Sequence, residues 1–501
     1  MPLSVLQEKK LTLRIYNTAT RRKEDLVLLR EGNVGIYVCG VTVYDLCHIG
    51  HARSAIVFDV LVRYLRASGL NVTYVRNFTD IDDKIIARAN ELAKDTFALA
   101  QQYIDAFRND MKSLGVLDAD VEPRATDHIE GMIKMIETLL ERGHAYQQGS
   151  DIFFSVESFK GYGALSGRRL DEMQAGSRIA VDENKRHPMD FVLWKAAKPG
   201  EPKWESPWGL GRPGWHLECS VMSNRYLGVS FDIHGGGKDL LFPHHENERA
   251  QSLCANGGEF ARHWVHNGFV TIESEKMSKS LGNFLTIRDA LKSHHSQVLR
   301  LFLLSKHYRS PIDFSASGVE AAQAGLVRIY RTLERLDNLL GPGKTNVDNK
   351  AFSAGDLSQG SNEDSFLPQF VSLMDDDLNT AGAIGLLFEK VRDINRLMDS
   401  SDTLRDDSSL RRLEDDRKDI LAAGQVLGLL ETRPEQFFAE LTRPSEAGGI
   451  DPAVIEEMIR ERTEARAKKD WAKADQVRNR LKEMGVILED GPQGTTWRLD
   501  V

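Results

Sequence analysis

Cysteine is scarce in this chain, with four residues (Cys39, Cys47, Cys219 and Cys254) among 501. So few thiols cannot form a disulfide scaffold for a chain of this length, and they indicate free thiols in a reducing compartment. The sequence also lacks any run of about 18 apolar residues, which argues against a membrane-spanning helix. Its first residues lack the basic and apolar segments of a secretory signal, so we expect a cytoplasmic protein without membrane contact.

An excess of positive charge is missing as well. The net charge of −9 argues against a general nucleic-acid coat. Locally, however, residues 460–482 contain nine Lys and Arg against four Asp and Glu. An acidic protein can still bind RNA along such a segment, so the net charge does not exclude an RNA partner.

A strand–helix–strand pattern stands near the start of the chain. Residues 35–40 read as a buried strand, apolar residues then recur at helical spacing up to Gly69, and residues 72–78 read as a second strand. This unit predicts a doubly wound, Rossmann-type α/β nucleotide-binding domain. We place it at residues 1–330, with an insertion at about 85–215 between the two halves of its sheet.

Composition divides the remainder of the chain. Residues 331–366 read as a helix end and a linker rich in Ser, Gly, Asn and Asp, which bury too little apolar area to order themselves. Residues 367–432 predict a helical bundle with a charged, mobile turn at 400–418. Residues 450–501 predict a small C-terminal RNA-binding domain with one long basic helix at 452–484.

Two short tags carry groups suited to phosphate chemistry. His48-Ile49-Gly50-His51 stands at a helix start, where free N–H groups and the helix dipole favour anions. His48 and His51 can donate to phosphate oxygens, and Gly50 lets a nucleotide approach the backbone closely. Each tag alone is short enough to be a chance match or an ordinary surface feature.

The second tag is Lys276-Met277-Ser278-Lys279-Ser280, in a loop at about 270–285. Lys276 and Lys279 beside Gly282 suit a mobile clamp that stabilises charge on a leaving pyrophosphate. The two tags in this order indicate ATP-dependent chemistry.

The tags resemble the signature sequences of class I aminoacyl-tRNA synthetases, and their surroundings are similar to the cysteinyl-tRNA synthetase family. The resemblance covers nearly the full length of the chain. The matching segments are residues 37–40, 43–45, 77–84, 213–219, 232–237, 242–248 and 490–497.

The resemblance implies ATP-dependent ligation of L-cysteine to its cognate tRNA through a cysteinyl-adenylate, with ATP and Mg²⁺ as substrate. It also implies that His48, His51, Lys276 and Lys279 stabilise the phosphates. A monomer is expected.

A metal site is expected where the first strand ends, because ligands of open α/β sheets gather there. Cys39 ends that strand, Cys219 lies in the second half of the sheet, and His244 and Glu248 stand four apart on a predicted helix. Two thiolates, an imidazole and a carboxylate form a plausible zinc set, although their spacing alone is weak evidence. The family resemblance implies one zinc ion on these four residues, which would select the thiol of cysteine over the hydroxyl of serine. His245 remains a rival ligand.

Further residues match family positions. Thr79, Trp215 and His234 correspond to the cysteine pocket, and Gly236 and Asp239 to the loop facing the nucleotide, with Asp239 as the ribose partner. In some family members the segment Lys84–Arg88 is linked to pyridoxal-phosphate-dependent persulfide formation; we favour its interpretation as the first turn of a helix.

The C-terminal domain carries the expected RNA contacts. The resemblance implies that the bundle braces the tRNA, and residues 376–380 resemble the bundle signature of the family. Basic residues of the last helix can follow phosphates. Exposed tryptophans there could stack on unpaired bases. The named candidates are Arg466, Trp471, Asp475, Asp490 and Trp497.

Two other functions stay open. A cysteine–amino-sugar ligase of the mycothiol pathway type shares the catalytic domain but should lack the basic helix and the tail at 491–497. A non-catalytic RNA-binding protein descended from a synthetase should have lost signature lysines or zinc positions, which are intact here.

Overall fold

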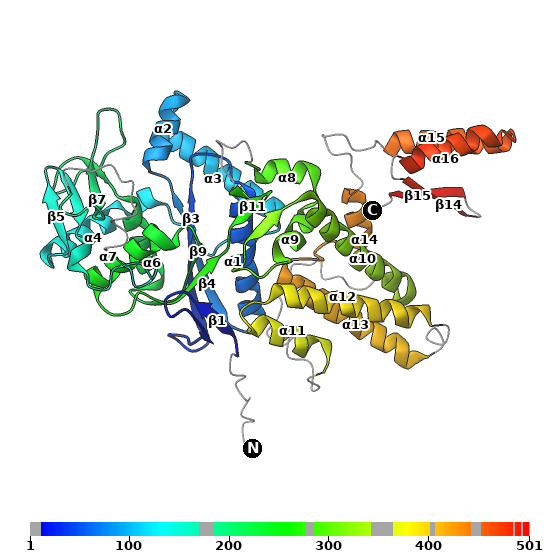
Figure 1. The fold of residues 1–501 in the computed structure, drawn as a ribbon, viewed down its shortest axis with the longest axis horizontal. Helices are drawn as coiled ribbons and strands as arrows, with labels where there is room; N and C mark the ends of the chain where they lie inside the picture. Colours follow the sequence, from blue (N-terminus) through cyan, green and yellow to red (C-terminus); the bar gives the residue numbers. More distant parts are fainter. Residues whose placement is uncertain are drawn as a thin grey trace, which may run out of the picture.

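The structure is a computed structural model of the 501-residue chain. It describes residues 12–169, 185–273, 275–276, 284–341, 364–400, 406–441, 452–483, 486–491 and 494–499. Figure 1 shows the insertion at one end of the long axis, a sheet in the centre, a helical bundle beside it and the C-terminal unit at the far end.

A four-stranded parallel sheet forms the centre, with the strand order β10-β9-β3-β4. The strands are β3 (Asn33–Thr42), β4 (Asn71–Thr79), β9 (Phe231–Gly237) and β10 (Ala261–Asn267). The chain starts the sheet at β3, adds β4 on one side and later β9 and β10 on the other. This order confirms the predicted doubly wound fold, and it puts the topological switch point between β3 and β9.

Two helices cover opposite faces of this sheet. Because side chains alternate along a strand, Ile36 and Val38 share a core with α1 (Ile49–Ala67), while Tyr37 shares a second core with α6 (Trp215–Leu227). Gly69, with φ of 88°, follows α1 and ends it as predicted.

The predicted insertion contains both helices and an antiparallel sheet of order β5-β6-β7-β8. Its elements are α2 (Asp83–Glu91), α3 (Thr96–Ser113), η1 (Ala125–His128), α4 (Ile129–Glu141), β5 (Ala145–Gln148), β6 (Asp151–Phe154), η2 (Val156–Ser158), β7 (Phe191–Ala196) and β8 (Gly211–Pro213). Lys84–Arg88 lies in the first turns of α2, where Asp82 accepts from the Lys84 N–H at 2.8 Å. This confirms the helical interpretation of that segment.

Shorter elements complete the catalytic half. They are β1 (Arg14–Asn17), β2 (Arg22–Asp25), η3 (Leu241–His245), α7 (Glu246–Asn256), β11 (Val270–Ile272), β12 (Glu275–Lys276), α8 (Ile287–Ser293), α9 (Ser296–Leu304) and β13 (Ile312–Phe314). In the small sheet β12-β11-β13, β11 pairs antiparallel with β12 and parallel with β13. The backbone of Lys276 thus lies in β12, whereas residues 277–283 with Lys279 fall outside the described residues.

A helical bundle follows, and it begins earlier than the sequence suggested. Its helices are α10 (Ala316–Leu340), α11 (Phe366–Asp375), α12 (Thr380–Asp399), α13 (Asp407–Leu427) and α14 (Pro434–Leu441). The predicted turn at 400–418 is wrong from residue 406 onwards: Asp406 caps α13 by accepting from the Ser408 N–H, and Leu413 is buried. The charges that suggested a turn lie mainly on the exposed face of this helix.

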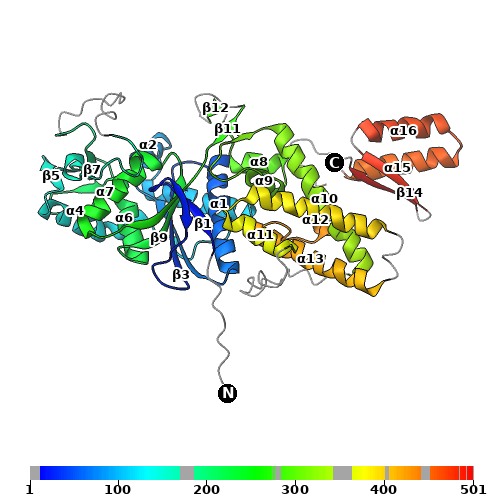
Figure 2. The same cartoon turned by 60° about the horizontal axis from the view of Figure 1, so that its bottom comes forward.

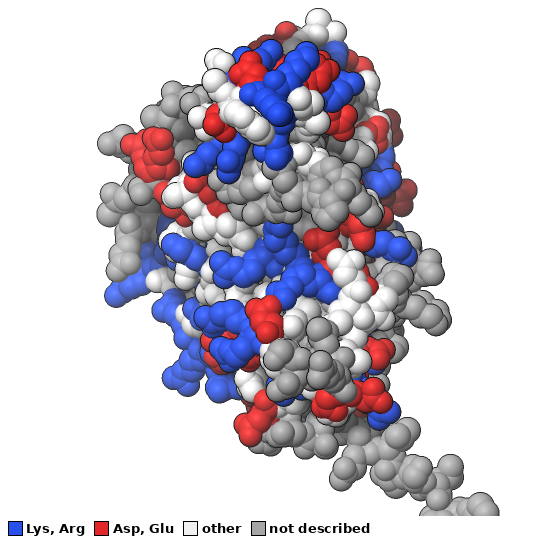
Figure 3. All heavy atoms as spheres, turned by 90° about the vertical axis from the view of Figure 1, so that its right-hand side faces the viewer, with Lys and Arg blue, Asp and Glu red and all other residues white. Residues whose placement is uncertain are grey.

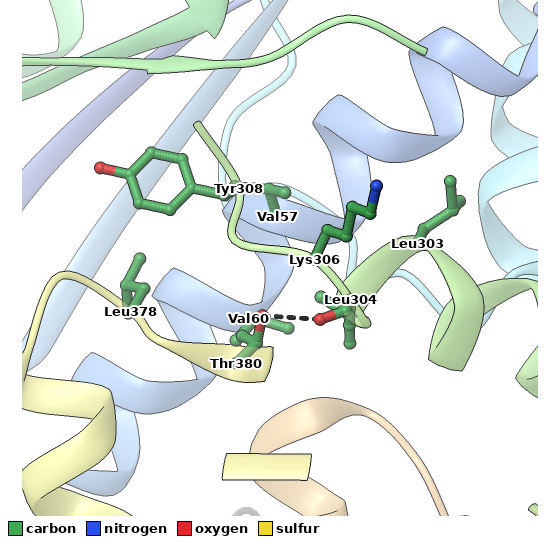
Figure 4. Close-up of a pocket in the computed structure, with 8 residues that line it drawn as sticks. All are labelled: Val57, Val60, Leu303, Leu304, Lys306, Tyr308, Leu378 and Thr380. Atoms are coloured by element: carbon green, nitrogen blue, oxygen red, sulfur yellow. Dashed lines mark hydrogen bonds between the residues drawn. The ribbon is translucent and has the colours of Figure 1, made fainter. Parts of the chain in front are cut away.

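The bundle docks on α1 and α9. The Thr380 hydroxyl donates to the carbonyl of Leu304 at 2.9 Å, beside a small apolar pocket (Figure 4). Val57, Val60, Leu303, Leu304, Lys306, Tyr308, Leu378 and Thr380 line the pocket. None of them is a predicted site residue.

The C-terminal unit contains a helical hairpin where a single helix was predicted. Its elements are α15 (Pro452–Ala467), α16 (Trp471–Glu483), β14 (Val486–Gly491) and β15 (Gly494–Leu499). The chain breaks at Lys469, with φ of 59°, and Asp470 then accepts from the Lys473 N–H at 3.1 Å. Folding back lets Ile455 pack with Val477 and Leu481, which a straight helix would leave exposed. Among the described residues, no helix is both long and apolar enough to cross a membrane.

Candidate active site and metal cluster

Four side chains far apart in the sequence meet at the switch point of the sheet. Cys39 Sγ lies 3.5 Å from Cys219 Sγ, 3.5 Å from His244 Nε2 and 3.2 Å from Glu248 Oε1. The ligand atoms of all four residues lie within 4.8 Å of one another. We call Cys39, Cys219, His244 and Glu248 the metal cluster.

The backbone at Cys39 differs from the expectation that this residue ends the strand. β3 continues to Thr42, but its register with β4 is irregular between Val38 and Val41. At this irregularity Gly40 packs so closely that a side chain would overlap the Asn77 carbonyl oxygen, and its N–H donates to the Asn77 side chain at 2.9 Å. A bulge of this kind re-aims a side chain, here the Cys39 thiol towards α6 and α7.

The other three ligands come from helices. Cys219 lies in α6 and Glu248 in the first turn of α7. His244 was predicted inside the same helix as Glu248, but it lies in the short π-helical segment η3 that directly precedes α7. This segment still preserves the four-residue relation, since His244 Nε2 lies 2.9 Å from Glu248 Oε1.

Further histidines hold the cluster in place. His234 Nε2 lies 2.8 Å from Glu248 Oε2, and His216 Nδ1 lies 2.9 Å from His244 Nδ1. Contacts of this kind fix the orientation of metal ligands. Although burial opposes it, His234 and His244 hold the pKa of Glu248 well below its usual range, so its carboxylate is ionised.

His245, the rival ligand, belongs to a second group with Cys39, His234 and Glu248. Its Nδ1 lies 2.8 Å from His266 Nε2, and its Nε2 lies 3.9 Å from Glu248 Oε1. The group containing His244 offers two thiols in place of one, and thiolate is the preferred donor for zinc. The geometry therefore favours His244, with His245 behind it.

The three residues assigned to the cysteine pocket lie around this cluster in different ways. Trp215 is half-buried and stacks on the His244 ring, with centroids 4.2 Å apart. Thr79 is buried and donates to Glu218 Oε2 at 2.7 Å, while His234 is fully buried behind Glu248. Of these three residues, Trp215 is thus the one whose side chain is partly exposed to solvent.

Sequence reasoning missed Glu218 and His216. Burial raises the pKa of Glu218 well above its usual range, which favours a neutral carboxyl in contact with Thr79. Both residues stand in the matched segment 213–219, directly beside a predicted ligand. That position was the available signal.

The histidine tag forms the start of α1. His48 is the N-cap: its Nδ1 accepts from the Gly50 N–H at 3.1 Å, and His51 Nδ1 accepts from the His48 N–H at 3.1 Å. The two rings lie 3.9 Å apart. Because each Nδ1 accepts, each proton of the neutral rings lies on Nε2, the donor suited to phosphate oxygen.

The chain that follows the lysine tag runs alongside the histidine tag. Phe284 packs edge-on against the His48 ring at 5.2 Å, and the Ile49 N–H donates to the Leu285 carbonyl at 3.1 Å. Phe284 and Leu285, which follow the lysine tag in the sequence, thus lie beside the histidine tag.

The nucleotide-facing candidates lie at the end of β9. A side chain at Gly236 would press on the His245 ring at 2.8 Å, and Asp239 is exposed in the turn after the strand. Both stand at the carboxyl edge of the sheet, where nucleotides bind in this fold class.

The RNA-binding candidates lie at the far end of the molecule. Trp471 is 60% exposed, and Arg466 and Asp475 are exposed on α15 and α16. Asp490 and Trp497 lie in β14 and β15, but their side chains fall outside the described residues.

Part of the predicted basic face is unsuited to phosphate. Arg462 is buried, with its guanidinium 3.4 Å from the Thr495 hydroxyl, and Lys473 pairs with Glu461 at 2.9 Å. Figure 3 shows Lys and Arg side chains mixed with Asp and Glu over the upper part of this end of the molecule, and a more uniformly basic area below.

Three family models match the chain. They are tRNA synthetases class I (C) catalytic domain at residues 25–324, DALR domain at 369–431, and cysteinyl-tRNA ligase anticodon binding domain at 452–498.

Curated relatives match over almost the whole length. The cysteine–tRNA ligase of Pelobacter propionicus is 52% identical over 495 residues, covering 98% of this chain and 100% of that protein. The cysteine–tRNA ligase of Syntrophobacter fumaroxidans is 52% identical over 494 residues with the same coverage.

Solved structures share the fold at low sequence identity. Mycobacterium tuberculosis methionyl-tRNA synthetase, in complex with methionyl-adenylate, aligns with a TM-score of 0.57 at 18% identity, over 84% of this chain and 98% of that chain. A putative arginyl-tRNA synthetase from Campylobacter jejuni aligns with a TM-score of 0.53 at 13% identity, over 80% and 93%.

Proposed function

We propose that this chain, which belongs to the cysteine–tRNA ligase family of class I aminoacyl-tRNA synthetases, joins L-cysteine to its cognate tRNA through a cysteinyl-adenylate. The observation that carries the proposal is the metal cluster at the switch point of the sheet, beside the helix that begins with the histidine tag. One site thus offers both an amino-acid selector and a phosphate-binding helix.

The proposed division of labour follows the chain. Residues 1–330 form the catalytic domain, 367–432 brace the tRNA and 450–501 bind its anticodon, with 331–366 between them. Because α10 packs in the bundle, the catalytic domain and the bundle share one hydrophobic core.

Adenylate formation is an in-line displacement. A carboxylate oxygen of cysteine attacks the α-phosphorus of ATP, a new P–O bond forms, and the bond to the leaving pyrophosphate breaks. His48 and His51 donate to phosphate oxygens, and Lys276 and Lys279 stabilise the pyrophosphate charge. Gly50 and Gly236 let the nucleotide approach the backbone, and Asp239 accepts from the ribose.

The residues of the metal cluster fit a zinc ion. Two thiols, an imidazole nitrogen and an ionised carboxylate converge in a buried site, and surrounding histidines orient two of them. Zinc held there would bind thiolate strongly and a neutral hydroxyl weakly, which would favour cysteine over serine beyond the discrimination of shape alone. Trp215, half-buried over His244, would exclude water from the side chain, and Thr79 and His234 would support the pocket from behind.

The second step transfers the cysteinyl group to the 2′-hydroxyl of the terminal adenosine and releases AMP. Arg466, Trp471, Asp475, Asp490 and Trp497 are the proposed contacts to the RNA. Because tRNA is charged where it is used, the proposal places the chain in the cytoplasm. Every residue it names comes from one chain, so a monomer suffices.

Charging of the cysteine tRNA by the purified full chain tests this function. We expect pyrophosphate exchange that depends on cysteine, and cysteinyl-tRNA in the presence of the tRNA. Adenylate formation without cysteinyl-tRNA would favour the amino-sugar ligase, which the match to the anticodon-binding model makes the weaker candidate. Absence of both activities would favour a non-catalytic RNA-binding protein.

The variant Cys219→Ser tests the zinc assignment. We expect zinc content and cysteine affinity to fall together, since a serine hydroxyl is a poor zinc ligand. Elemental analysis measures the metal independently of activity. Cys254→Ser is the matched control, because Cys254 is also a buried thiol but lies outside the metal cluster. Normal zinc in Cys219→Ser would refute the assignment.

A further inference from the structure

Arg53 is an unusual residue of α1. It lies two positions after His51, is fully buried, and directs its guanidinium into a group of backbone carbonyls. It donates to Phe269 O at 2.6 Å, Gly268 O at 3.2 Å, His307 O at 3.3 Å and Tyr308 O at 3.4 Å, and also to Ser310 O. We call these five acceptors the carbonyl cage.

The carbonyl cage joins two separate chain segments. Residues 268–269 lead directly into β11, and residues 307–310 lead into β13. The segments also bond to each other, since the Gly268 N–H donates to Tyr308 O at 2.8 Å and the Ile312 N–H to Phe269 O at 3.0 Å. Arg53 therefore hydrogen-bonds the segments that lead into β11 and β13 of the small sheet β12-β11-β13. The third strand of this sheet, β12, contains Lys276 (Figure 2).

The stabilisation of the Arg53 guanidinium depends on the positions of the carbonyl groups around it. All hydrogen bonds of Arg53 among the described residues go to neutral carbonyls, and burial lowers its pKa to about 10, so the charge persists at neutral pH. A guanidinium in a site without a carboxylate is stabilised only if several carbonyl dipoles point at it together. The donors are fixed in a plane, so the two segments must keep their places around them.

The backbone is built for this close approach. A side chain at Gly268 would come within 2.6 Å of Ser310 O and 2.8 Å of Arg309 O. The two segments thus meet backbone to backbone, with no side chain between them to adjust the spacing.

We propose that Arg53 is a positioning residue for adenylate formation, which fixes the sheet carrying Lys276 relative to His48 and His51. The helix α1 then carries the phosphate-binding histidines at its start. One turn later it carries Arg53, which holds the backbone of the small sheet that contains Lys276. This inference rests on the proposed function, because it assigns Arg53 to the same ATP reaction. It adds a residue that touches neither substrate nor metal.

The test is a double-mutant cycle in pyrophosphate exchange with the full chain. Arg53→Met keeps the volume and removes the donors; we expect at least a tenfold loss of kcat, with zinc content and the KM for cysteine little changed. Lys276→Ala should lower kcat in the wild-type background but much less in the Arg53→Met background. In the Arg53→Met variant a displaced Lys276 already stabilises the transition state less, so its removal costs less. A residue that served stability alone would leave the two losses multiplicative.

Arg66→Met is the matched control. Arg66 lies on the same helix, is partly exposed, and pairs with Asp120 at 2.9 Å on the side of the insertion. We expect its kcat for exchange to equal that of the wild type.

If Arg53→Met fails to fold, Arg53→Lys replaces it in the double-mutant cycle. Lysine retains the charge but replaces the planar fork by a single ammonium group, so we expect partial rescue of kcat and partial recovery of the Lys276→Ala effect. Wild-type kcat in Arg53→Met, or equal Lys276→Ala losses in the wild-type and Arg53-variant backgrounds, would overturn the role of Arg53. Failure of cysteine-dependent exchange in the wild type would instead overturn the proposed function.

Discussion

The hydrogen bonds of the two signature histidines determine where their protons lie. Both Nδ1 atoms accept from backbone N–H groups at the start of α1, which leaves Nε2 as the protonated nitrogen of each neutral ring. Burial and the neighbouring His48 lower the pKa of His51 from 6.5 to about 3. His51 is therefore a neutral donor at every pH at which the chain would work.

This protonation state predicts the pH dependence of a His51 variant. The pKa is lowered, so the ring stays neutral above about pH 3 and its protonation cannot cause a loss of rate near pH 6.5. We expect His51→Asn to lower pyrophosphate exchange roughly 100- to 1,000-fold, as removal of a donor to transition-state charge does. The pH–rate profiles of variant and wild type between pH 5.5 and 8 should nevertheless have the same shape. An acidic limb near pH 6.5 that disappears only in the variant would contradict the assignment.

His234 is expected to act on the metal and not directly on cysteine. It is fully buried and its Nε2 lies 2.8 Å from Glu248 Oε2, so it orients a proposed zinc ligand. We expect His234→Leu, which has no donor for Glu248, to weaken zinc binding roughly 10- to 100-fold, the usual effect of losing such support. Competition with a chelator measures this without an activity assay. His263→Leu is the control, because His263 is also buried but hydrogen-bonds the Asp232 carbonyl at 3.3 Å. Equal zinc retention in both variants would place His234 outside the metal's support.

Single residues show how far the sequence could predict the site. The four residues of the metal cluster could be named through the family resemblance, and the structure brings them together. Their spacing alone could not have shown this, because the bulge after Val38 and the turn before α7 decide where Cys39 and His244 point. Glu218 was missed, although it stands in a matched segment, because a buried carboxyl reads in sequence as an ordinary helix surface residue.

At the scale of elements, a buried carboxylate is one of the groups that hold the bundle on the catalytic domain. Asp377 accepts from the Tyr16 N–H, the Tyr308 hydroxyl and the Arg309 guanidinium, each at 2.8 Å. Asp377 and Leu378 both have positive φ, at 64° and 51°. Conformations of this kind persist only where the surroundings determine them. The segment 376–380, which resembles the bundle signature of the family, therefore joins the bundle to the catalytic domain.

This junction predicts different effects for two adjacent residues. Asp377→Asn weakens the acceptor of the Tyr16 N–H, the Tyr308 hydroxyl and the partly exposed Arg309 guanidinium, and we expect a cost of about 1–3 kcal/mol, the usual cost of leaving a buried hydrogen-bonding group unsatisfied. Asp376→Asn removes only an exposed pair with Lys23, and we expect about 0.5 kcal/mol or less. Thermal melting of the two variants measures the difference. Equal melting temperatures would show that the bundle docks without Asp377.

The C-terminal hairpin shows what limits prediction at this scale. Helical periodicity runs almost continuously through residues 452–483, so a single helix was the simplest interpretation. The break needed one non-glycine residue with positive φ, at Lys469, and this conformation has no strong sequence signal. What favours it is the tertiary contact of Ile455 with Leu481, and Arg462 is buried by the same fold-back. The doubly wound sheet was easier to predict, because the spacing of apolar residues in the sequence differs between its strands and its helix.

At the scale of the molecule, the proposed amino-acid site and the proposed anticodon site lie at separate places along the long axis. The metal cluster belongs to the central sheet, α6 and α7, whereas α15 and α16 lie beyond the bundle (Figures 1 and 2). The two partial reactions should therefore respond to different substitutions. A change confined to the C-terminal hairpin should alter tRNA recognition and leave adenylate formation unchanged.

Trp471→Ala tests this separation in the full chain. Trp471 is 60% exposed, so its removal should cost little stability, but stacking on an unpaired base contributes about 1–3 kcal/mol. We expect the KM for tRNA in charging to rise roughly 5- to 100-fold, with cysteine-dependent pyrophosphate exchange at the wild-type rate. Phe97→Ala is the control, because Phe97 is a 45% exposed aromatic residue on the insertion, and it should alter neither reaction. If Trp471→Ala slowed pyrophosphate exchange, the hairpin would have to act on the catalytic domain as well as on tRNA. If it left the KM for tRNA unchanged, the stacking role of Trp471 would be wrong.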